Sequence, residues 1–395
     1  MIDRKIEPVL VNLARQYPVV TITGPRQSGK TTLCRKVFAG LKYVNLEAPD
    51  TRMFAREDPR GFLAANSGGV ILDEIQRAPD LLSYIQTMVD LDDRPGQFIL
   101  TGSQQFEVMN VISQSLAGRT ALLKLLPLSF PELRQTLPAD MDRLMITGFY
   151  PRIHDRQLNP SQALGDYLET YVERDLRQLA VLKDLSLFEK FLKLCAGRVA
   201  QLLSLQSLSN DVGVSHSTAR AWLTLLEASY IVFLLQPWHA SVSKRLIKSP
   251  KLYFYDVGLA SYLLGLTHES QMSRDPLRGN LFENMLILEA LKHRYNLGLR
   301  NNLFFYRESN GNEVDLIAAS GRDILAIEIK SAATVNPDFF KGLHHFKKAA
   351  GSGQNVRGAI VYGGKEMQMR SDFPVYPLRH CEDLWNGIDS PARKP

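Results

Sequence analysis

The chain is poor in the features that mark secreted and membrane proteins. Its three cysteines, Cys34, Cys195 and Cys381, lie far apart, which excludes a disulfide framework and a metal site built on a Cys-x-x-Cys pair. Its densest apolar runs, such as residues 231–235, are far shorter than the roughly 18 residues needed to cross a bilayer. Residues 1–8 contain no apolar run typical of a secretory leader. We therefore expect a soluble, cytoplasmic protein with no membrane partner.

Charge of one sign is not concentrated anywhere in the chain. Lys and Arg number 47 against 41 Asp and Glu, and each third of the chain carries two more basic than acidic residues. A net charge of +6 attracts polyanions in general, but an excess spread so evenly does not by itself indicate a nucleic-acid-binding protein. With 395 residues, 45% of them hydrophobic, the chain is long enough for two or three domains with separate cores.

A phosphate-binding loop stands near the start of the chain. The β-branched run 19–23 leads directly into the G-x-x-x-x-G-K-T pattern, and a helical pattern follows. Backbone N–H groups and the helix N-terminus would surround the phosphates, Lys30 would reach the β- and γ-phosphates, and the Thr31 hydroxyl would hold Mg²⁺. The predicted nucleotide-binding residues of this loop are Gly24, Pro25, Arg26, Gln27, Ser28, Gly29, Lys30, Thr31 and Thr32.

Two carboxylates follow the third predicted strand. Residues 69–75 read Gly-Val-Ile-Leu-Asp-Glu-Ile, and such an apolar run is typical of a parallel strand buried on both faces. Ligands of parallel sheets bind at the carboxyl ends of the strands. We therefore expect Asp73 to hold Mg²⁺ through water, and Glu74 to orient and deprotonate the attacking water.

Polar residues also end the next predicted strand, at 97–103. Thr101, Ser103 and Gln104 are the candidates for contact with the γ-phosphate or the attacking water. If this strand lies between the two nucleotide-binding strands, the domain belongs to the additional-strand class of P-loop ATPases. Further along, Arg119 is a candidate sensor of the γ-phosphate, in the same subunit or a neighbouring one, and an ordinary structural role fits it equally well.

Five segments together carry a specific resemblance: GPRQSGKTT, VILDEIQ, FILTGSQ, LAGRT and LPLSFPEL. This combination resembles the AAA-type ATPases that carry a C-terminal domain of unknown function, DUF4143, and the rest of the chain resembles the same group. The resemblance implies a nucleotide-binding first domain, in agreement with the motifs, so ATP and Mg²⁺ are the expected cofactors. Because few activities in this group are characterised, the resemblance implies an architecture more than a biological role.

The middle of the chain predicts helices and then a winged helix. Apolar residues recur every three or four positions from 161 to 203, which indicates amphipathic helices. A short helix at 205–211, a glycine turn and a longer helix at 215–229 precede two strands, at 230–235 and 251–255. This is the order of a helix-turn-helix with a β-wing.

Two interpretations of the winged helix stay open. His216, Ser217 and Arg220 would face outward at the start of the second helix, and the basic segment 244–251 would lie on the wing, where it could contact DNA phosphates. The alternative is a protein-docking or lid module, because Arg220 is the only charged residue near the start of that helix.

The last third predicts a β-hairpin with charged residues on one face. Strands are expected at 304–306, 313–319 and 324–330. If Gly321 and Arg322 are the central residues of the second turn, the numbers of paired residues sum to 643.

This register brings four charged side chains together. Asp315 lies opposite Glu328, and Glu313 opposite Lys330, all on one face because strand periodicity is two. Two opposed carboxylates repel unless a cation lies between them, and a divalent ion would supply that charge. Lys330 would then stabilise developing phosphate charge or position water.

The spacing Asp-x(12)-Glu-x-Lys resembles the PD-(D/E)xK nuclease superfamily. That resemblance implies an upstream acidic residue on a helix, which Glu283 matches, and a metal site of Glu283, Asp315 and Glu328 for a second Mg²⁺ or for Mn²⁺. The alternatives are an active nuclease, with Asp315, Glu328 and Lys330 catalytic, and an inactive domain that only binds.

We therefore expect an α/β protein in three parts. Residues 1–134 are predicted to form a P-loop ATPase domain on a parallel sheet, residues 135–270 a helical and winged-helix domain, and residues 271–395 a PD-(D/E)xK nuclease-like α/β domain. The predicted function is Mg²⁺-dependent ATP binding and hydrolysis, coupled to DNA or to the nuclease-like domain. The alternative is a regulatory switch with an inactive nuclease-like domain that binds protein partners. ATP is the expected ligand, and DNA, protein partners and further copies of the chain are the candidate macromolecular partners.

Overall fold

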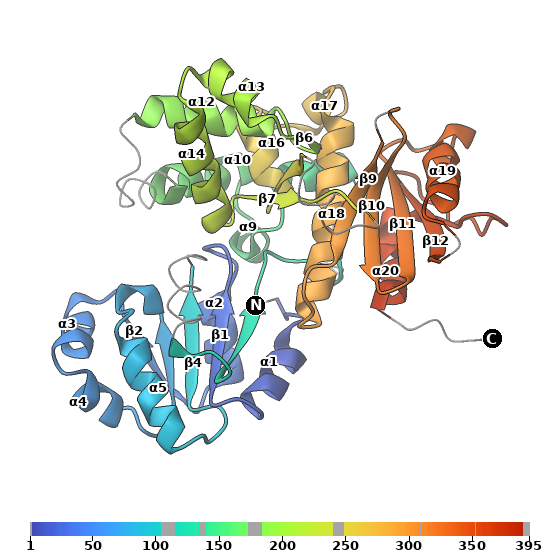
Figure 1. The fold of residues 1–395 in the computed structure, drawn as a ribbon. Helices are drawn as coiled ribbons and strands as arrows, with labels where there is room; N and C mark the ends of the chain where they lie inside the picture. The colour runs from blue at the N-terminus through green and yellow to red at the C-terminus, as the bar shows by residue number, and fades with distance from the viewer. Residues whose placement is uncertain are drawn as a thin grey trace.

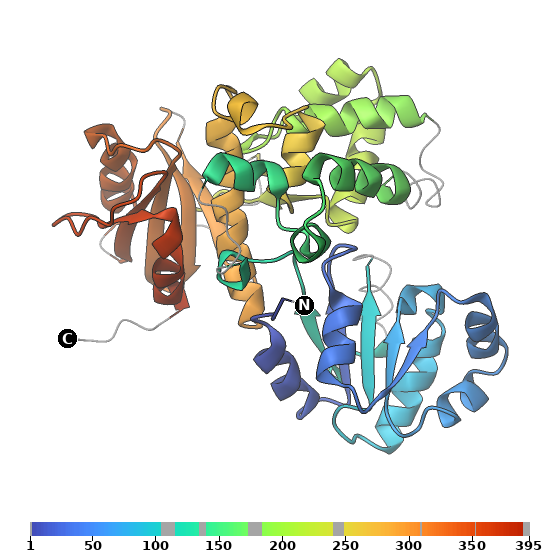
Figure 2. The same ribbon diagram turned by 180° about the vertical axis from the view of Figure 1, so that it is seen from behind.

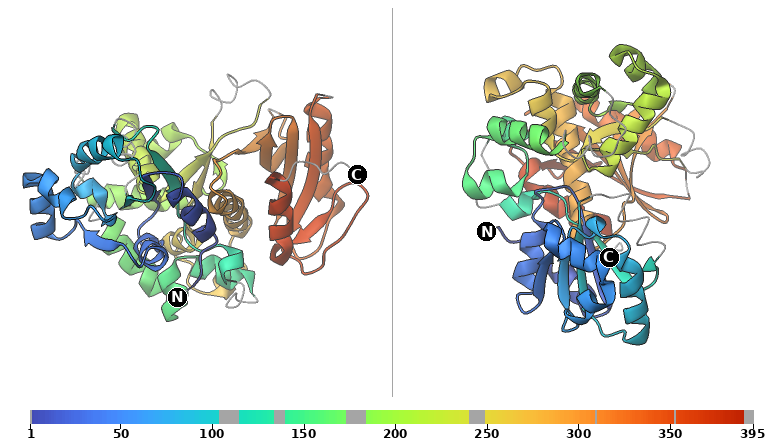
Figure 3. Two further views of the ribbon diagram at one scale, coloured as in Figure 1. Left: turned by 90° about the horizontal axis from the view of Figure 1, so that it is seen from below. Right: turned by 90° about the vertical axis from the view of Figure 1, so that its left-hand side faces the viewer.

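The computed structural model describes residues 2–103, 115–133, 140–172, 184–239, 249–308, 310–351 and 353–389. Two five-stranded sheets and a smaller three-stranded sheet organise these residues (Figure 1). Seen from below, the N-terminal sheet and the C-terminal sheet lie at opposite ends of the molecule, with helices between them (Figure 3). Within the described ranges, none of the helices combines the length and apolar character needed to cross a membrane.

The N-terminal sheet is parallel and has the strand order β2-β3-β4-β1-β5. Every residue of β1, β3 and β4 is buried, because helices cover both faces. β4 lies between β1 and β3, which is the arrangement of the additional-strand class. The strands are β1 (Val19–Thr23), β2 (Lys42–Asn45), β3 (Val70–Asp73), β4 (Phe98–Gly102) and β5 (Thr120–Lys124).

Two hydrophobic clusters fill the two sides of this sheet. Alternation along the strands places Leu72 and Leu100 in one cluster and Ile71 and Ile99 in the other. The helices and 3₁₀ turn around the sheet are α1 (Glu7–Ala14), α2 (Lys30–Val37), α3 (Pro49–Glu57), α4 (Pro59–Ala64), η1 (Ile75–Arg77) and α5 (Leu81–Leu91).

The middle region is mainly helical. Its helices are α7 (Phe130–Leu133), α8 (Met141–Thr147), α9 (Pro151–Arg156), α10 (Pro160–Tyr167), η2 (Leu168–Val172), α12 (Leu185–Ala196), α13 (Leu205–Val212), α14 (His216–Ala228), α16 (Val257–Leu263) and α17 (Glu269–Met272). An antiparallel sheet of order β6-β8-β7 joins them, with β6 (Gln201–Leu202), β7 (Val232–Leu235) and β8 (Lys251–Phe254).

The α13–α14 pair has the local signals of a helix-turn-helix. Gly213 adopts a left-handed backbone, with φ of 91°, between the two helices, and the Ser215 hydroxyl accepts a hydrogen bond from the Thr218 N–H at the start of α14. Most of the basic segment predicted for the wing lies outside the described residues. Its last residue, Lys251, is buried and paired with carboxylates, so its predicted exposure to phosphate is wrong.

The C-terminal sheet has the order β13-β12-β11-β10-β9. It carries α18 and α20 on one face and α19 on the other, and hydrophobic side chains are buried on both. Its elements are α18 (Arg278–Asn296), β9 (Leu303–Arg307), β10 (Glu313–Ser320), β11 (Asp323–Lys330), η3 (Pro337–Phe340), α19 (Lys341–Ala349), β12 (Asn355–Tyr362), β13 (Val375–Pro377), η4 (Leu378–His380) and α20 (Cys381–Asp389).

The predicted hairpin register is confirmed over most of its length. β10 and β11 pair from Leu316 with Ile327 to Ser320 with Asp323, so paired numbers sum to 643. The predicted pairs of Asp315 with Glu328 and of Glu313 with Lys330 are not part of this register. The β9–β10 pairing shifts at a bulge between Val314 and Ile317, and Glu313 there lies opposite Arg307 of β9.

Helix α18 connects the parts of the molecule. Buried residues occur all round it, and one hydrophobic cluster joins it to the middle helices and to the C-terminal sheet. Its C-terminal end contacts β5 of the N-terminal sheet. Figure 2 shows α18, in orange, standing beside the C-terminal sheet and reaching down toward the N-terminal sheet.

Candidate functional site

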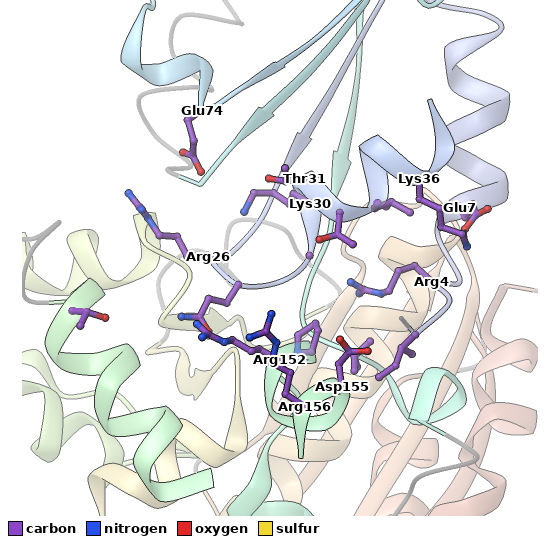
Figure 4. Close-up of a pocket in the computed structure, with 18 residues that line it drawn as sticks. Arg4, Glu7, Arg26, Lys30, Thr31, Lys36, Glu74, Arg152, Asp155 and Arg156 are labelled. Carbon is purple, nitrogen blue, oxygen red and sulfur yellow. Dashed lines mark hydrogen bonds and ion pairs between the residues drawn. The ribbon is translucent and has the colours of Figure 1, made fainter. Parts of the chain in front are cut away.

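A cavity of about 810 Å³ lies beside the P-loop (Figure 4). One wall is formed by the loop and α2, and another by α9 of the middle region. Six cationic side chains line it: Arg4, Arg26, Lys30, Lys36, Arg152 and Arg156. Three acidic side chains line it: Glu7, Glu74 and Asp155. This excess of positive charge suits an anion that carries several negative charges.

The P-loop is shaped by glycines and by a buried lysine. Gly24 has φ of 147°, and a Cβ there would clash with the Leu125 carbonyl, so the close approach requires glycine. The Lys30 ammonium, on a residue only 5% exposed, donates to the carbonyls of Gly24 (2.9 Å) and Pro25 (2.8 Å). Burial lowers the pKa of Lys30 to about 8, although nearby carboxylates oppose the shift.

An arginine distant in sequence from the loop motif stabilises the loop by hydrogen bonds to backbone carbonyls. Arg4 Nη1 donates to the Ser28 carbonyl (2.6 Å) and Nη2 donates to the Leu126 carbonyl (2.7 Å). Its Nε pairs with Glu132 at 3.0 Å, and both side chains are buried. Sequence reasoning missed this role because the partners lie 24 to 128 residues from Arg4.

The structure brings the predicted magnesium residues together. The Thr31 hydroxyl lies 3.1 and 3.0 Å from the two carboxylate oxygens of Asp73. Asp73, 5% exposed, also accepts hydrogen bonds from Tyr43 Oη (2.7 Å) and from the Thr101 hydroxyl. A carboxylate and a hydroxyl at the carboxyl edge of the sheet form an oxygen donor set that fits Mg²⁺. The sequence contained no signal for Tyr43, which belongs to a neighbouring strand.

The Glu74 carboxylate lines the cavity beyond the end of β3. Its backbone is left-handed, with φ of 58°, a conformation that costs on the order of 1 kcal/mol for a residue other than glycine. The carboxylate accepts hydrogen bonds from the Ser103 hydroxyl (2.9 Å) and from the Gln76 amide. Ser103 therefore contacts Glu74 directly, and Gln76 joins this group without having been predicted.

Of the two interpretations of Arg119, the structure fits the structural role. Arg119 pairs with Asp90 of α5, with Nη2 2.9 Å from a carboxylate oxygen, and it does not line the cavity. Arg152 and Arg156 of α9, which the sequence analysis did not single out, are exposed and line the cavity across from Lys30 (Figure 4). Gln104, another candidate, lies outside the described residues.

The C-terminal candidates also meet, but in ion pairs. Lys330 lies 3.2 Å from Asp315 and 2.7 Å from Glu328. Glu283 of α18 pairs with Lys251 of β8 at 2.9 Å. Burial raises the pKa of both Glu283 and Glu328, and the charge of Asp315 adds to the increase. Across the described part of the chain, no group of three or more His, Cys, Asp or Glu is placed to hold a metal ion.

Three family models match successive parts of the chain. Residues 16–134 match the AAA domain family, residues 278–381 match the domain of unknown function DUF4143, and residues 138–270 match another domain of unknown function, DUF8612. An uncharacterized protein of Mycobacterium tuberculosis is 34% identical over 362 residues, 91% of this chain and 79% of the relative. An uncharacterized protein of Haemophilus influenzae is 22% identical over 264 residues, 63% of this chain and 62% of the relative.

Similarity to solved structures is weaker. A Walker-type ATPase of Pyrococcus abyssi has 15% identity and a TM-score of 0.44, over 67% of this chain and 96% of the other. AMPPCP-bound DnaA of Aquifex aeolicus has 15% identity and a TM-score of 0.28, over 56% and 85% of the two chains. Scores this low do not establish a shared fold. The mycobacterial similarity and the order of the matched families show instead that this chain belongs to the AAA-type P-loop ATPases with a C-terminal DUF4143 domain.

Proposed function

We propose that the chain binds ATP with Mg²⁺ in the cavity beside the P-loop and hydrolyses it. The observation that carries the proposal is the meeting of Lys30, the Thr31–Asp73 pair and Glu74 at one edge of a parallel sheet. Membership of the AAA family supports nucleotide binding, and the charge of the cavity suits a triphosphate.

Each side chain has a distinct task in this proposal. The P-loop N–H groups and the Lys30 ammonium hold the β- and γ-phosphates, while Thr31 and, through water, Asp73 hold Mg²⁺. The bound metal supplies positive charge that offsets the charge of the phosphates. Glu74 orients the attacking water and accepts its proton. Ser103 and Gln76 keep the Glu74 carboxylate in one orientation through their hydrogen bonds.

The position of α9 supports coupling between the nucleotide and the rest of the chain. Because Arg152 and Arg156 belong to the middle region, a triphosphate in the cavity would attract that region toward the P-loop, and loss of the γ-phosphate would weaken the attraction. Helix α18 packs against the middle helices and the C-terminal sheet in one core, so a displacement of the middle region would be transmitted to that sheet.

The output of this coupling is proposed to be regulatory. The carboxylates of the C-terminal sheet are paired with lysines, which favours the inactive nuclease-like domain over the active nuclease. DNA is a second candidate partner because His216, Ser217 and Arg220 are exposed at the start of α14. Titration with duplex DNA at several salt concentrations tests this candidate. Binding that weakens less steeply with salt in Arg220→Ala supports phosphate contact, and absence of binding removes DNA as a partner.

Two substitutions test the ATPase proposal. Lys30→Ala should abolish binding of a fluorescent ATP analogue, whereas Lys341→Ala, which removes an exposed lysine of α19, should not change it. Glu74→Gln should keep ATP bound and slow phosphate release by about 10²-fold or more. Full turnover in both Lys30→Ala and Glu74→Gln would overturn the assignment.

A further inference from the structure

Four carboxylates from three elements gather around two lysines beside the C-terminal sheet. They are Glu283 of α18, Glu313 and Asp315 of β10, and Glu328 of β11. Lys330 bridges Asp315 and Glu328, and Asp315 also accepts the Ile329 N–H at 2.8 Å. Helix α19 packs closely against β10 at this point, because a Cβ on Gly342 would clash with the Glu313 carbonyl.

The second cation in this cluster comes from another sheet. Lys251 is the first residue of β8, the middle strand of the three-stranded sheet, and it pairs there with Leu202 on one side and Leu235 on the other. Its side chain leaves that sheet and is 3% exposed. The ammonium lies 2.9 Å from Glu283, also pairs with Glu313, and sits 5.5 Å from the centre of the Phe305 ring.

One carboxylate oxygen of the cluster still lacks a partner. Glu328 is 8% exposed, and its Oε1 pairs with Lys330, but its Oε2 has no hydrogen bond within the described part of the structure. Oε2 points toward α19, where a Cβ on Gly342 would lie 3.5 Å from it. A buried oxygen without a partner is costly, so this cluster keeps capacity for one more cationic contact.

We infer that the Lys251 ammonium is a built-in cation, which holds the position that a divalent metal ion would otherwise take among these carboxylates. With Lys251 in place, Glu283 and Glu313 share the positive charge of a group fixed to β8, and a metal ion would have to displace it. Without Lys251, Glu283 and Glu313 would lose their buried cation, and carboxylate oxygens are the hard ligands that Mg²⁺, Mn²⁺ or Ca²⁺ prefer. The contact is therefore autoinhibitory for metal binding, and it also ties the middle region to the C-terminal sheet.

Mn²⁺ titration of the full-length chain without nucleotide tests this inference. Lys251→Met, which keeps the length of the side chain and removes its charge, should bind one more Mn²⁺ ion than the wild type, at least about tenfold more tightly at this site. The double variant Lys251→Met/Asp315→Asn should lose that gain. Lys251→Arg, which keeps a cation in place, should show no gain.

Two outcomes would overturn the inference. One is Mn²⁺ binding by the wild type that Asp315→Asn removes, because the site would then accept a metal with Lys251 present. The other is a folded Lys251→Met that gains no Mn²⁺ binding. If Lys251→Met does not fold, Lys251→Gln takes its place, and the wild-type and Asp315→Asn titrations stand independently. ATP affinity serves as the separate readout, because all these variants leave the P-loop cavity intact and the inference does not depend on ATP hydrolysis.

Discussion

The two charged regions at opposite ends of the molecule differ in how far their charges are already compensated. At the P-loop cavity, among the described residues, the Lys30 ammonium donates hydrogen bonds to two backbone carbonyls, and neither Arg152 nor Arg156 forms an ion pair. In the C-terminal cluster, Lys251 and Lys330 are each placed between two carboxylates. The first region can bind a negatively charged ligand, whereas the charges of the second are largely paired with one another within the chain.

A motif therefore predicts which side chains meet, but it does not predict whether those side chains are free to bind a ligand. Both regions carry the expected residue types at the expected spacing. What separates them is a residue outside the motif, Lys251, which lies 32 residues before its partner Glu283 and belongs to another sheet. We call the P-loop cavity the open end and the C-terminal cluster of Glu283, Glu313, Asp315 and Glu328 the closed end. Substitutions at the open end should therefore change ligand binding, and substitutions at the closed end should change the stability of the fold.

The largest expected effect is on the stability of the closed end. Lys251→Met leaves Glu283 and Glu313 without their buried cation, and loss of one partner of such a pair costs about 3–5 kcal/mol. Denaturant unfolding in metal-free buffer should show this loss, while ATP affinity stays unchanged. The matched control is Lys341→Met, since the Lys341–Asp338 pair is exposed and its loss should cost less than about 1 kcal/mol. Equal losses in the two variants would contradict the comparison.

The next effect is on ligand binding at the open end. Arg152→Ala combined with Arg156→Ala should weaken ATP binding by about 10²-fold, because each charge-assisted contact with phosphate contributes about tenfold or more. AMP affinity and stability should change little, since both arginines are exposed. Arg143→Ala, on α8 and outside the cavity lining, is the control. A double variant that binds ATP like the wild type would remove α9 from the site.

The pH dependence of ATP affinity tests the role of the Lys30 charge. Because burial lowers its pKa to about 8, the free protein loses the ammonium charge as the pH rises through that value. ATP affinity should therefore fall by about tenfold between pH 7 and pH 9, and a constant affinity over this range would contradict this role of Lys30. Stability should respond in the opposite sense. Burial of the charged form disfavours folding below pH 8, and this penalty disappears as the pH rises toward 10.5, the ordinary value for lysine.

The smallest effect is expected at the magnesium residues. Tyr43→Phe removes the 2.7 Å hydrogen bond to Asp73, a loss of about 1 kcal/mol, so the Mg²⁺ concentration for half-maximal hydrolysis should rise about fivefold. Tyr84→Phe, on the exposed side of α5, provides the control. An unchanged Mg²⁺ requirement in Tyr43→Phe would show that Thr31 and Thr101 suffice to orient Asp73.

Sequence reasoning succeeded where local spacing determines geometry. Residues 24–32 form one loop, and strands of a parallel sheet end at a shared edge, so the meeting of Thr31 with Asp73 was predictable. The hairpin register followed from the two-residue turn at Gly321, and it held from Leu316 to Ser320. Strand order was not predictable, since nothing in the chain marks β4 as the strand between β1 and β3.

Sequence reasoning failed where a distant side chain decides the environment. Glu313 was expected opposite Lys330, but a bulge in β10 turns it toward Arg307 and Lys251. Lys251 was counted among the phosphate-binding residues of a wing because its neighbours are basic, and only the packing of β8 against the C-terminal region shows it buried. Arg4 carried no motif at all, yet it holds the P-loop carbonyl of Ser28.

The most direct test of the account is one incubation of the wild-type chain with supercoiled plasmid, ATP, and Mg²⁺ or Mn²⁺, with phosphate release and plasmid cleavage followed in the same samples. The account predicts that phosphate is released and that the plasmid stays supercoiled, because the open end receives ATP and the closed end receives no metal. Plasmid cleavage that is lost in Asp315→Ala and Glu328→Ala would contradict it.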